Sequence, residues 1–294
     1  MKLDFEILSD NNLSDKYYHL SLINDFEDGE WRYDKFQNFI GDNLALSALS
    51  AKERNALIDN FNFETMRVES LKKLRKSIYK NNAEGSELAE ICLYGIMSRH
   101  YNALPIVPKI FYKQNSNDYA KGADSVHLVL NENDYEIWLG ESKFYKDVDL
   151  AFKAALDSVE SMLSTDKLKK ENSIITNLPE LNELKHDYLT EGMIKDILNT
   201  LDFKSSIDDF KKRLHIPIFI LHECELTQNS TDFTIYKDSL IENHEEKIIR
   251  YKKNMLAKLA NIYNITDISF HIILFPIPEK ERIRKWFIED FVGN

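Results

Sequence analysis

The chain has 294 residues, of which 43% are hydrophobic and 30% are charged, so it is long enough to bury a substantial core. Its formal net charge of −11 argues against a protein that coats nucleic acid by bulk electrostatics, because Lys and Arg normally supply the phosphate contacts. The low content of Gly and Pro, eight and six residues, argues against long flexible linkers.

The first ten residues have no apolar core flanked by positive charge, so we expect no secretory signal. No run approaches the roughly 18 consecutive apolar residues of a membrane-spanning helix. The two cysteines, Cys92 and Cys224, lack the CxxC spacing of zinc and redox sites. We therefore predict a cytoplasmic protein with two buried thiols and no membrane contact.

Residues 1–80 start with an apolar, strand-like segment at residues 3–7, have a second apolar segment at residues 17–23, and continue with helical sequence rich in Lys and Glu. No chemical motif occurs in them. A basic cluster at residues 72–76 is typical of a solvated helix face. We interpret residues 1–80 as an accessory, partner-binding region.

From Ser86 the pattern changes, because apolar residues recur at helical spacing over residues 88–96 and Ser86 can cap the N-terminus. This predicts the first core helix of a catalytic domain at residues 81–294. A Pro-containing link at 104–108, a short apolar segment at 109–112 and a polar loop at 114–119 follow.

Two strands are expected at residues 123–130 and 135–144, joined by a short polar turn into a hairpin. An apolar stripe over residues 148–163 predicts the second core helix. Residues 165–214 are charged and are interpreted as a mainly helical insertion. A strand at 216–222, a helix at 239–263, a strand at 268–275 and a closing helix complete the chain, which indicates an α/β fold with a mixed sheet flanked by helices.

The second strand of the hairpin carries a row of side chains that begins apolar and ends charged. Because side chains alternate across a strand, the row that starts at Tyr135 ends in Glu141 and Lys143. A carboxylate and an ammonium are costly to bury in a core-facing row unless they pair or bind an ion. The pair is therefore a candidate for function.

Asp124 stands at the start of the preceding strand. The short turn makes the two strands antiparallel neighbours, so we expect Asp124 beside Glu141 and Lys143. Two carboxylates can hold Mg²⁺ or Mn²⁺, which neutralises a scissile phosphate and lowers the pKa of a water, while the lysine stabilises the attacking hydroxide. An exposed salt-bridge cluster without function is the alternative interpretation.

A further metal ligand is expected from the first core helix, where Glu87 and Glu90 are the candidates. Glu90 is preferred because it lies next to the apolar residues Ile91 and Leu93 and should lean toward the sheet. Glu87 can instead favour the helix N-terminus through the macrodipole.

Three segments together resemble the HamA family of the Hachiman anti-phage defence system, whose members have a PD-(D/E)xK, restriction-endonuclease-like core. These segments are residues 85–90 (GSELAE), 121–127 (KGADSVH) and 138–145 (WLGESKFY). The likeness covers about residues 85–165 well, and the flanks by general layout.

The resemblance implies a DNA nuclease that is held inactive by, and acts with, a partner helicase in a heterodimer. By carry-over, Asp124 and Glu141 would be metal ligands and Lys143 the catalytic lysine. A helicase that supplies most DNA contacts would account for the acidic net charge. Two alternatives stay open, a catalytically silent subunit that regulates a helicase and a nuclease that cleaves RNA.

Overall fold

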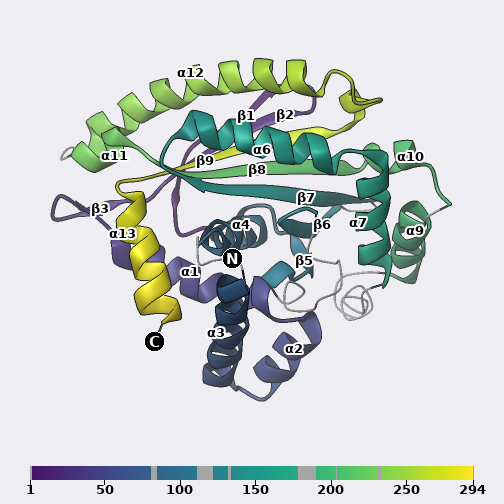
Figure 1. Ribbon diagram of the computed structural model, residues 1–294, viewed down its shortest axis with the longest axis horizontal. Helices are drawn as coiled ribbons and strands as arrows, with labels where there is room; N and C mark the ends of the chain where they lie inside the picture. The colour runs from purple at the N-terminus through teal and green to yellow at the C-terminus, as the bar shows by residue number, and fades with distance from the viewer. Residues whose placement is uncertain are drawn as a thin grey trace.

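The computed structural model describes residues 2–80, 85–110, 122–131, 134–177, 190–202, 204–230 and 233–293. Its centre is a seven-stranded sheet in the order β1-β2-β9-β8-β7-β6-β5 (Figure 1). The strands are β1 (Glu6–Ser14), β2 (Tyr17–Ile23), β5 (Leu104–Val107), β6 (Ser125–Asn131), β7 (Asp134–Tyr145), β8 (Leu214–Glu223) and β9 (Ser269–Ile277). The central strands β2, β9, β8 and β7 are parallel, and β1, β6 and β5 pair antiparallel.

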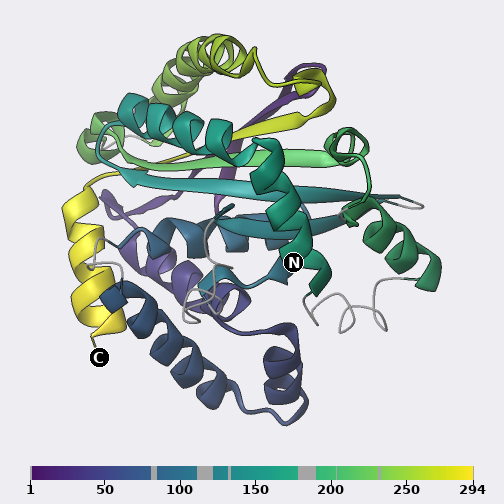
Figure 2. The same cartoon turned by 45° about the vertical axis from the view of Figure 1, so that its right-hand side comes forward.

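Helices cover both faces of this sheet (Figures 1 and 2). One face packs against α6 (Val148–Met162) and α12 (Phe233–Leu259), and its core extends to α7 (Thr165–Asn177), α9 (Glu191–Leu201) and α10 (Ile207–Lys211). The other face packs against α1 (Tyr33–Ala48), α4 (Glu87–His100) and α13 (Lys280–Lys285), with α3 (Phe63–Lys80) and α2 (Ala51–Asp59) further out. The predicted α/β fold is confirmed, and it is consistent with a PD-(D/E)xK-like core.

Shorter elements complete the described chain. They are β3 (Phe26–Glu27), β4 (Glu30–Trp31), α11 (Glu225–Asn229), a 3₁₀ helix (Ile265–Asp267) and a π-helical segment (Trp286–Val292). The strands β3 and β4 form a separate two-stranded sheet.

Strand β7 buries side chains on both faces, as is typical of a strand inside a covered sheet. Ile137 and Leu139 belong to the core on the α6 side, whereas Trp138 and Phe144 belong to the core on the α4 side. The alternation of side chains along β7 thus decides which helix layer each residue faces.

The first strands of the chain lie in the main sheet. β2 pairs in parallel with β9, from Tyr17 opposite Phe270 to Ser21 opposite Leu274. Phe5 packs on Phe275, with ring centroids 4.6 Å apart. Residues 1–80 therefore share one core with the predicted catalytic domain; that they bind a partner stays a prediction.

Two segments differ from their predicted structure. The Pro-containing link is the edge strand β5, and an edge tolerates Pro105 because one row of its backbone groups needs no partner strand. β1 extends through polar, largely exposed sequence, since its backbone pairs with β2 while its side chains face solvent. The predicted loop at residues 114–119 lies outside the described residues.

The described part of residues 165–214 is mainly helical; that these residues are an insertion stays a prediction. Within the described residues, no helix is long and apolar enough to cross a membrane. Both cysteines are free thiols, but only Cys92 is fully buried; Cys224, which stands between β8 and α11, is half-buried.

Candidate active site

The hairpin of β6 and β7 brings the predicted acidic residues together. Ser125 pairs with Gly140, and Asp124, directly before β6, also bonds the backbone of Gly140, the residue before Glu141. Glu141 and Lys143 continue the β7 row that faces α6. The charge of Asp124 acts on Glu141, so the two carboxylates lie close enough to repel each other.

Asp124 is held by the residue between Glu141 and Lys143. The backbone N–H of Asp124 donates to the carbonyl oxygen of Gly140 at 2.8 Å. Its Oδ2 accepts hydrogen bonds from the backbone N–H of Ser142 at 2.9 Å and from the Ser142 hydroxyl at 3.1 Å. These bonds fix the Asp124 carboxylate to the strand that carries the other two residues.

Glu141 and Lys143 form an ion pair that is largely withdrawn from solvent. Lys143 Nζ donates to Glu141 Oε1 and lies 3.4 Å from the hydroxyl oxygen of Ser158 on α6. The side chains of Glu141 and Lys143 are 6% and 18% exposed, so the lysine is the more accessible partner.

The same environment shifts both pKa values. Burial and then the charge of Asp124 raise the pKa of Glu141 from 4.5 to about 7, although Lys143 opposes this rise. For Lys143, burial lowers the pKa, but the neighbouring Glu141 outweighs it and the net shift is upward. Lys143 is therefore an ammonium group at neutral pH.

Glu87 and Glu90, the two glutamates of α4, have different neighbours in the structure. Glu87 Oε1 accepts a hydrogen bond at 3.0 Å from the Ser77 hydroxyl on α3, so Glu87 points to the outer helix layer. Glu90 and Asp124 both act electrostatically on the Tyr94 hydroxyl, which places them around one group. Glu90 and Asp124 thus share Tyr94 as a neighbour, whereas Glu87 is bonded to α3; which of the two glutamates is a metal ligand stays a prediction.

The carboxylate oxygens of Asp124 and Glu141 are suitable ligands for a small divalent cation. Carboxylate oxygens are the ligands that Mg²⁺ prefers, and Mg²⁺ usually takes one or two carboxylates and keeps several waters. A cation between Asp124 and Glu141 would relieve the repulsion that contributes to the raised pKa of Glu141. In the part of the chain that the structure describes, no three His, Cys, Asp or Glu side chains converge on one metal position. The fit is therefore that of a two-carboxylate site.

Two serines of the site were not predicted from the sequence. Ser142 orients Asp124, and Ser158 lies beside Lys143. Ser158 had a detectable signal, since it stands seven residues after Ala151 on the apolar stripe of α6 and is polar where the stripe is otherwise apolar. Ser142 had none, because a serine in a strand is common and its partner is distant in sequence.

A family model described as HamA matches residues 2–291. The match covers essentially the whole chain, including the N-terminal strands and the segments after residue 165. A comparison with curated protein sequences gives no match.

Proposed function

Because the chain belongs to the HamA family, we propose that it is a metal-dependent DNA nuclease, the effector subunit of a two-component Hachiman-type complex. Family membership makes it a Hachiman anti-phage defence protein. The nuclease assignment is supported by one observation above all, the position of Asp124 beside a buried Glu141–Lys143 pair.

Each residue has a distinct task in phosphodiester hydrolysis. A bound Mg²⁺ or Mn²⁺ would neutralise charge on the phosphate and lower the pKa of a water molecule. Asp124 and Glu141 would hold the cation, with Glu90 as the candidate further ligand. Lys143 is already protonated, so it donates hydrogen bonds to the attacking oxygen or the phosphate instead of accepting a proton. Ser142 keeps Asp124 oriented throughout.

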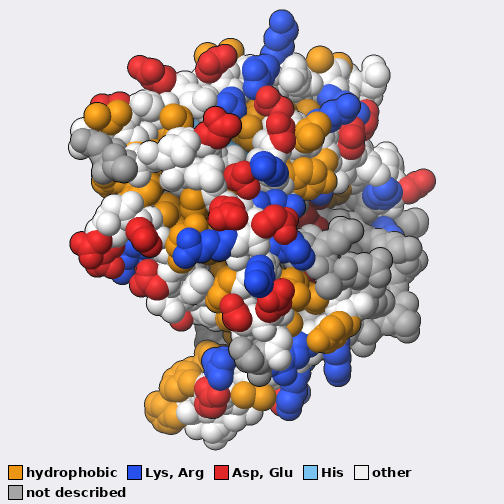
Figure 3. All heavy atoms as spheres, turned by 60° about the vertical axis from the view of Figure 1, so that its left-hand side comes forward, with side chains coloured by type: hydrophobic (Ala, Val, Ile, Leu, Met, Phe, Trp, Pro, Cys, Tyr) orange, Lys and Arg blue, Asp and Glu red, His pale blue; other side chains and the backbone are white. Residues whose placement is uncertain are grey.

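The charge distribution supports a partner that supplies most of the DNA contacts. The net charge is −11, and Figure 3 shows acidic and basic side chains interspersed over one face of the molecule. Nucleic-acid affinity depends on clustered Lys and Arg, which neutralise phosphates. We therefore propose a cytoplasmic heterodimer in which a helicase subunit binds DNA, restrains the nuclease and releases it on infection.

The test uses the purified complex with its helicase, plasmid DNA and Mg²⁺. Glu141→Gln and Lys143→Met should each lower the cleavage rate at least about 100-fold, because each removes a group that acts on the reacting phosphate. The matched controls, Glu160→Gln and Lys153→Met, change exposed residues of α6 and should cleave like the wild type. Chelation with EDTA should abolish cleavage in every sample.

The outcomes separate the alternatives. Full cleavage by a folded Glu141→Gln protein would overturn the active site. A wild-type complex that is inert with Mg²⁺ under activating conditions would support a silent subunit that regulates the helicase. Cleavage of RNA but not DNA would change the substrate class and leave the site intact.

A further inference from the structure

Lys109 and Glu171 form the most completely buried ion pair among the described residues. The Lys109 ammonium lies 3.3 Å from the Glu171 carboxylate, and the side chains are 0% and 1% exposed. Lys109 follows β5, and Glu171 lies on α7, 62 residues further along the chain. A buried ion pair seldom stabilises a fold more than apolar side chains of similar size, because both charges lose their hydration. Stability alone therefore does not explain why Lys109 and Glu171 are buried as an ion pair.

Glu171 packs directly on the segment that leads to Asp124. A Cβ at Gly122 would lie 1.5 Å from Glu171 Oε1 and 2.5 Å from its Cδ, so only glycine leaves room for this carboxylate. Oε2 accepts the bond from Lys109, whereas Oε1 has no hydrogen-bond partner within the described ranges. The Glu171 side chain thus limits how closely the residues before Asp124 approach α7.

Lys109 is also linked, by a hydrogen bond to Tyr94, to helix α4, which carries Glu90. The backbone N–H of Lys109 donates to the Tyr94 hydroxyl oxygen at 3.2 Å, and this hydroxyl donates to the carbonyl oxygen of Val107. Tyr94 stands one turn after Glu90 on α4. Burial raises the pKa of Tyr94, and the charges of Glu90 and Asp124 raise it further, so both carboxylates lie near the hydroxyl.

We infer that Lys109 and Glu171 are positioning residues that fix the Asp124 segment relative to helix α4, and through it set the affinity of the site for a divalent cation. The inference rests on the proposed function, because it assumes that Asp124 binds the cation. One end of the pair packs on the Asp124 segment and the other is bonded to the Glu90 helix. Helix α7 of the predicted insertion is thereby tied to the active site.

Mn²⁺ binding to the purified full chain tests this, with free Mn²⁺ measured by electron paramagnetic resonance. The variant Lys109→Met/Glu171→Ala removes both charges together, so no buried charge is left alone. It should fold, as judged by circular dichroism, and bind Mn²⁺ about 10–100-fold more weakly, the usual effect of losing groups that orient metal ligands.

A rescue experiment separates positioning from general damage. Gly122→Ala alone should weaken Mn²⁺ binding, because its Cβ collides with Glu171. In the Lys109→Met/Glu171→Ala background the collision with the carboxylate is gone, so adding Gly122→Ala should cause only the smaller loss that comes from the strained backbone of Gly122, at a φ of +157°. A loss of the same size in both backgrounds would show that Glu171 does not act through Gly122 and would overturn the inference.

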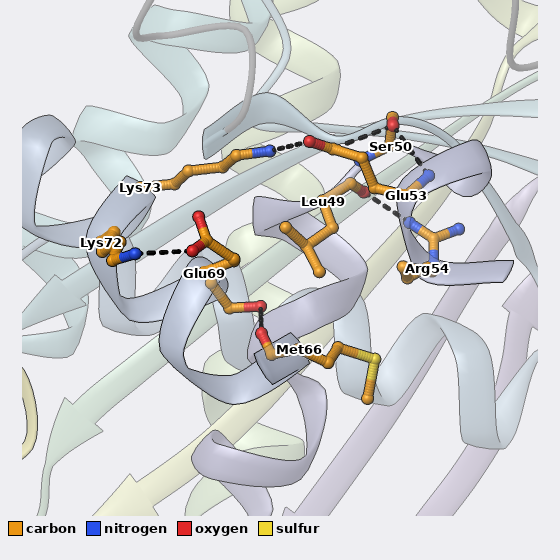
Figure 4. Close-up of polar contacts among 9 residues, drawn as sticks. Leu49, Ser50, Glu53, Arg54, Met66, Glu69, Lys72 and Lys73 are labelled. Atoms are coloured by element: carbon orange, nitrogen blue, oxygen red, sulfur yellow. Dashed lines mark hydrogen bonds and ion pairs between the residues drawn. The ribbon is translucent and has the colours of Figure 1, made fainter. Parts of the chain in front are cut away.

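The control is Lys73→Met/Glu53→Gln, which removes an ion pair between α2 and α3 (Figure 4) and should bind Mn²⁺ like the wild type. If Lys109→Met/Glu171→Ala also binds like the wild type, even with a lowered melting temperature, the pair is merely structural and the inference fails alone. If the wild type binds Mn²⁺ no better than Glu141→Gln, the proposed metal site and the inference fail together.

Discussion

Two regions of the molecule each contain a Lys–Glu ion pair, but one pair is buried and the other is partly exposed to solvent. Near the candidate site, Lys109 and Glu171 are 0% and 1% exposed, whereas in the α2–α3 arm, residues 51–80, Lys73 and Glu53 are 14% and 41% exposed. A solvated pair contributes about 0–1 kcal/mol, but a buried charge left without its partner costs about 3–5 kcal/mol. Burial, rather than charge content, therefore distinguishes the two regions.

The α2–α3 arm shows what an ordinary charged helix surface looks like (Figure 4). Lys72 bonds Glu69 at 2.6 Å, and Lys73 bonds Glu53 at 2.6 Å. Glu53 also completes a capping box with Ser50 at the start of α2. These contacts are those expected of the solvated basic face that the sequence predicts at residues 72–76.

The largest contrast is expected when each lysine loses its charge. Lys109→Met leaves the Glu171 carboxylate buried without its partner and should lower the free energy of unfolding by about 3–5 kcal/mol. Lys73→Met should lower it by at most about 1 kcal/mol, because water can solvate Glu53. Urea unfolding of both variants measures the difference. Equal losses would remove the distinction between the two regions.

The free energy of unfolding should depend on pH through the buried Glu141, unlike through an exposed glutamate. The pKa of Glu141 is raised from 4.5 to about 7 in the folded protein, so folding favours the protonated form. This contribution is complete below pH 4.5 and is lost as the pH rises through about 7. Relative to Glu141→Gln, the wild type should therefore lose about 1.4 kcal/mol for each unit by which the pKa is raised.

Urea unfolding in EDTA between pH 4 and 8 measures this difference. Glu160→Gln is the control, because Glu160 is exposed and pairs with Lys258 on the surface. A stability difference between wild type and Glu141→Gln that stays constant over this range would mean that Glu141 titrates like an ordinary glutamate.

A smaller loss is expected where the N-terminal helix α1 packs on α4. A Cβ at Gly95 on α4 would lie 2.5 Å from the Phe39 ring and 2.7 Å from the Asn43 side chain on α1. Gly95→Ala should therefore cost about 1–3 kcal/mol through overpacking. Thermal unfolding should remain a single transition, because both helices belong to one core. Two separate transitions would instead indicate that residues 1–80 unfold by themselves.

The smallest effect is expected in the α2–α3 arm. Glu53→Ala removes the capping-box carboxylate and the bond to Lys73, which together should cost about 1 kcal/mol. Proteolysis or urea unfolding can detect the loss, and plasmid cleavage by the complex should be unchanged. A strong loss of cleavage would assign the arm a part in activity that its exposed contacts do not suggest.

The features that follow from neighbouring residues could be predicted from the amino-acid sequence. The turn after β6 makes an antiparallel hairpin, and the alternation of side chains places Glu141 and Lys143 on one face with Asp124 beside them. The amphipathic stripe of α6 is likewise a local periodicity. Such patterns can be predicted because they depend on the geometry of a single strand, turn or helix.

Contacts between segments that are distant in the sequence became visible only in the folded chain. β2 joins β9 by parallel pairing across most of the chain, and Lys109 meets Glu171 over 62 intervening positions. The contact between Glu171 and Gly122 depends on where α7 packs, since neither residue carries a local signal of the other. Burial and charge pairing between such segments arise only when the whole core closes, because their free energy depends on the surroundings that every other element supplies.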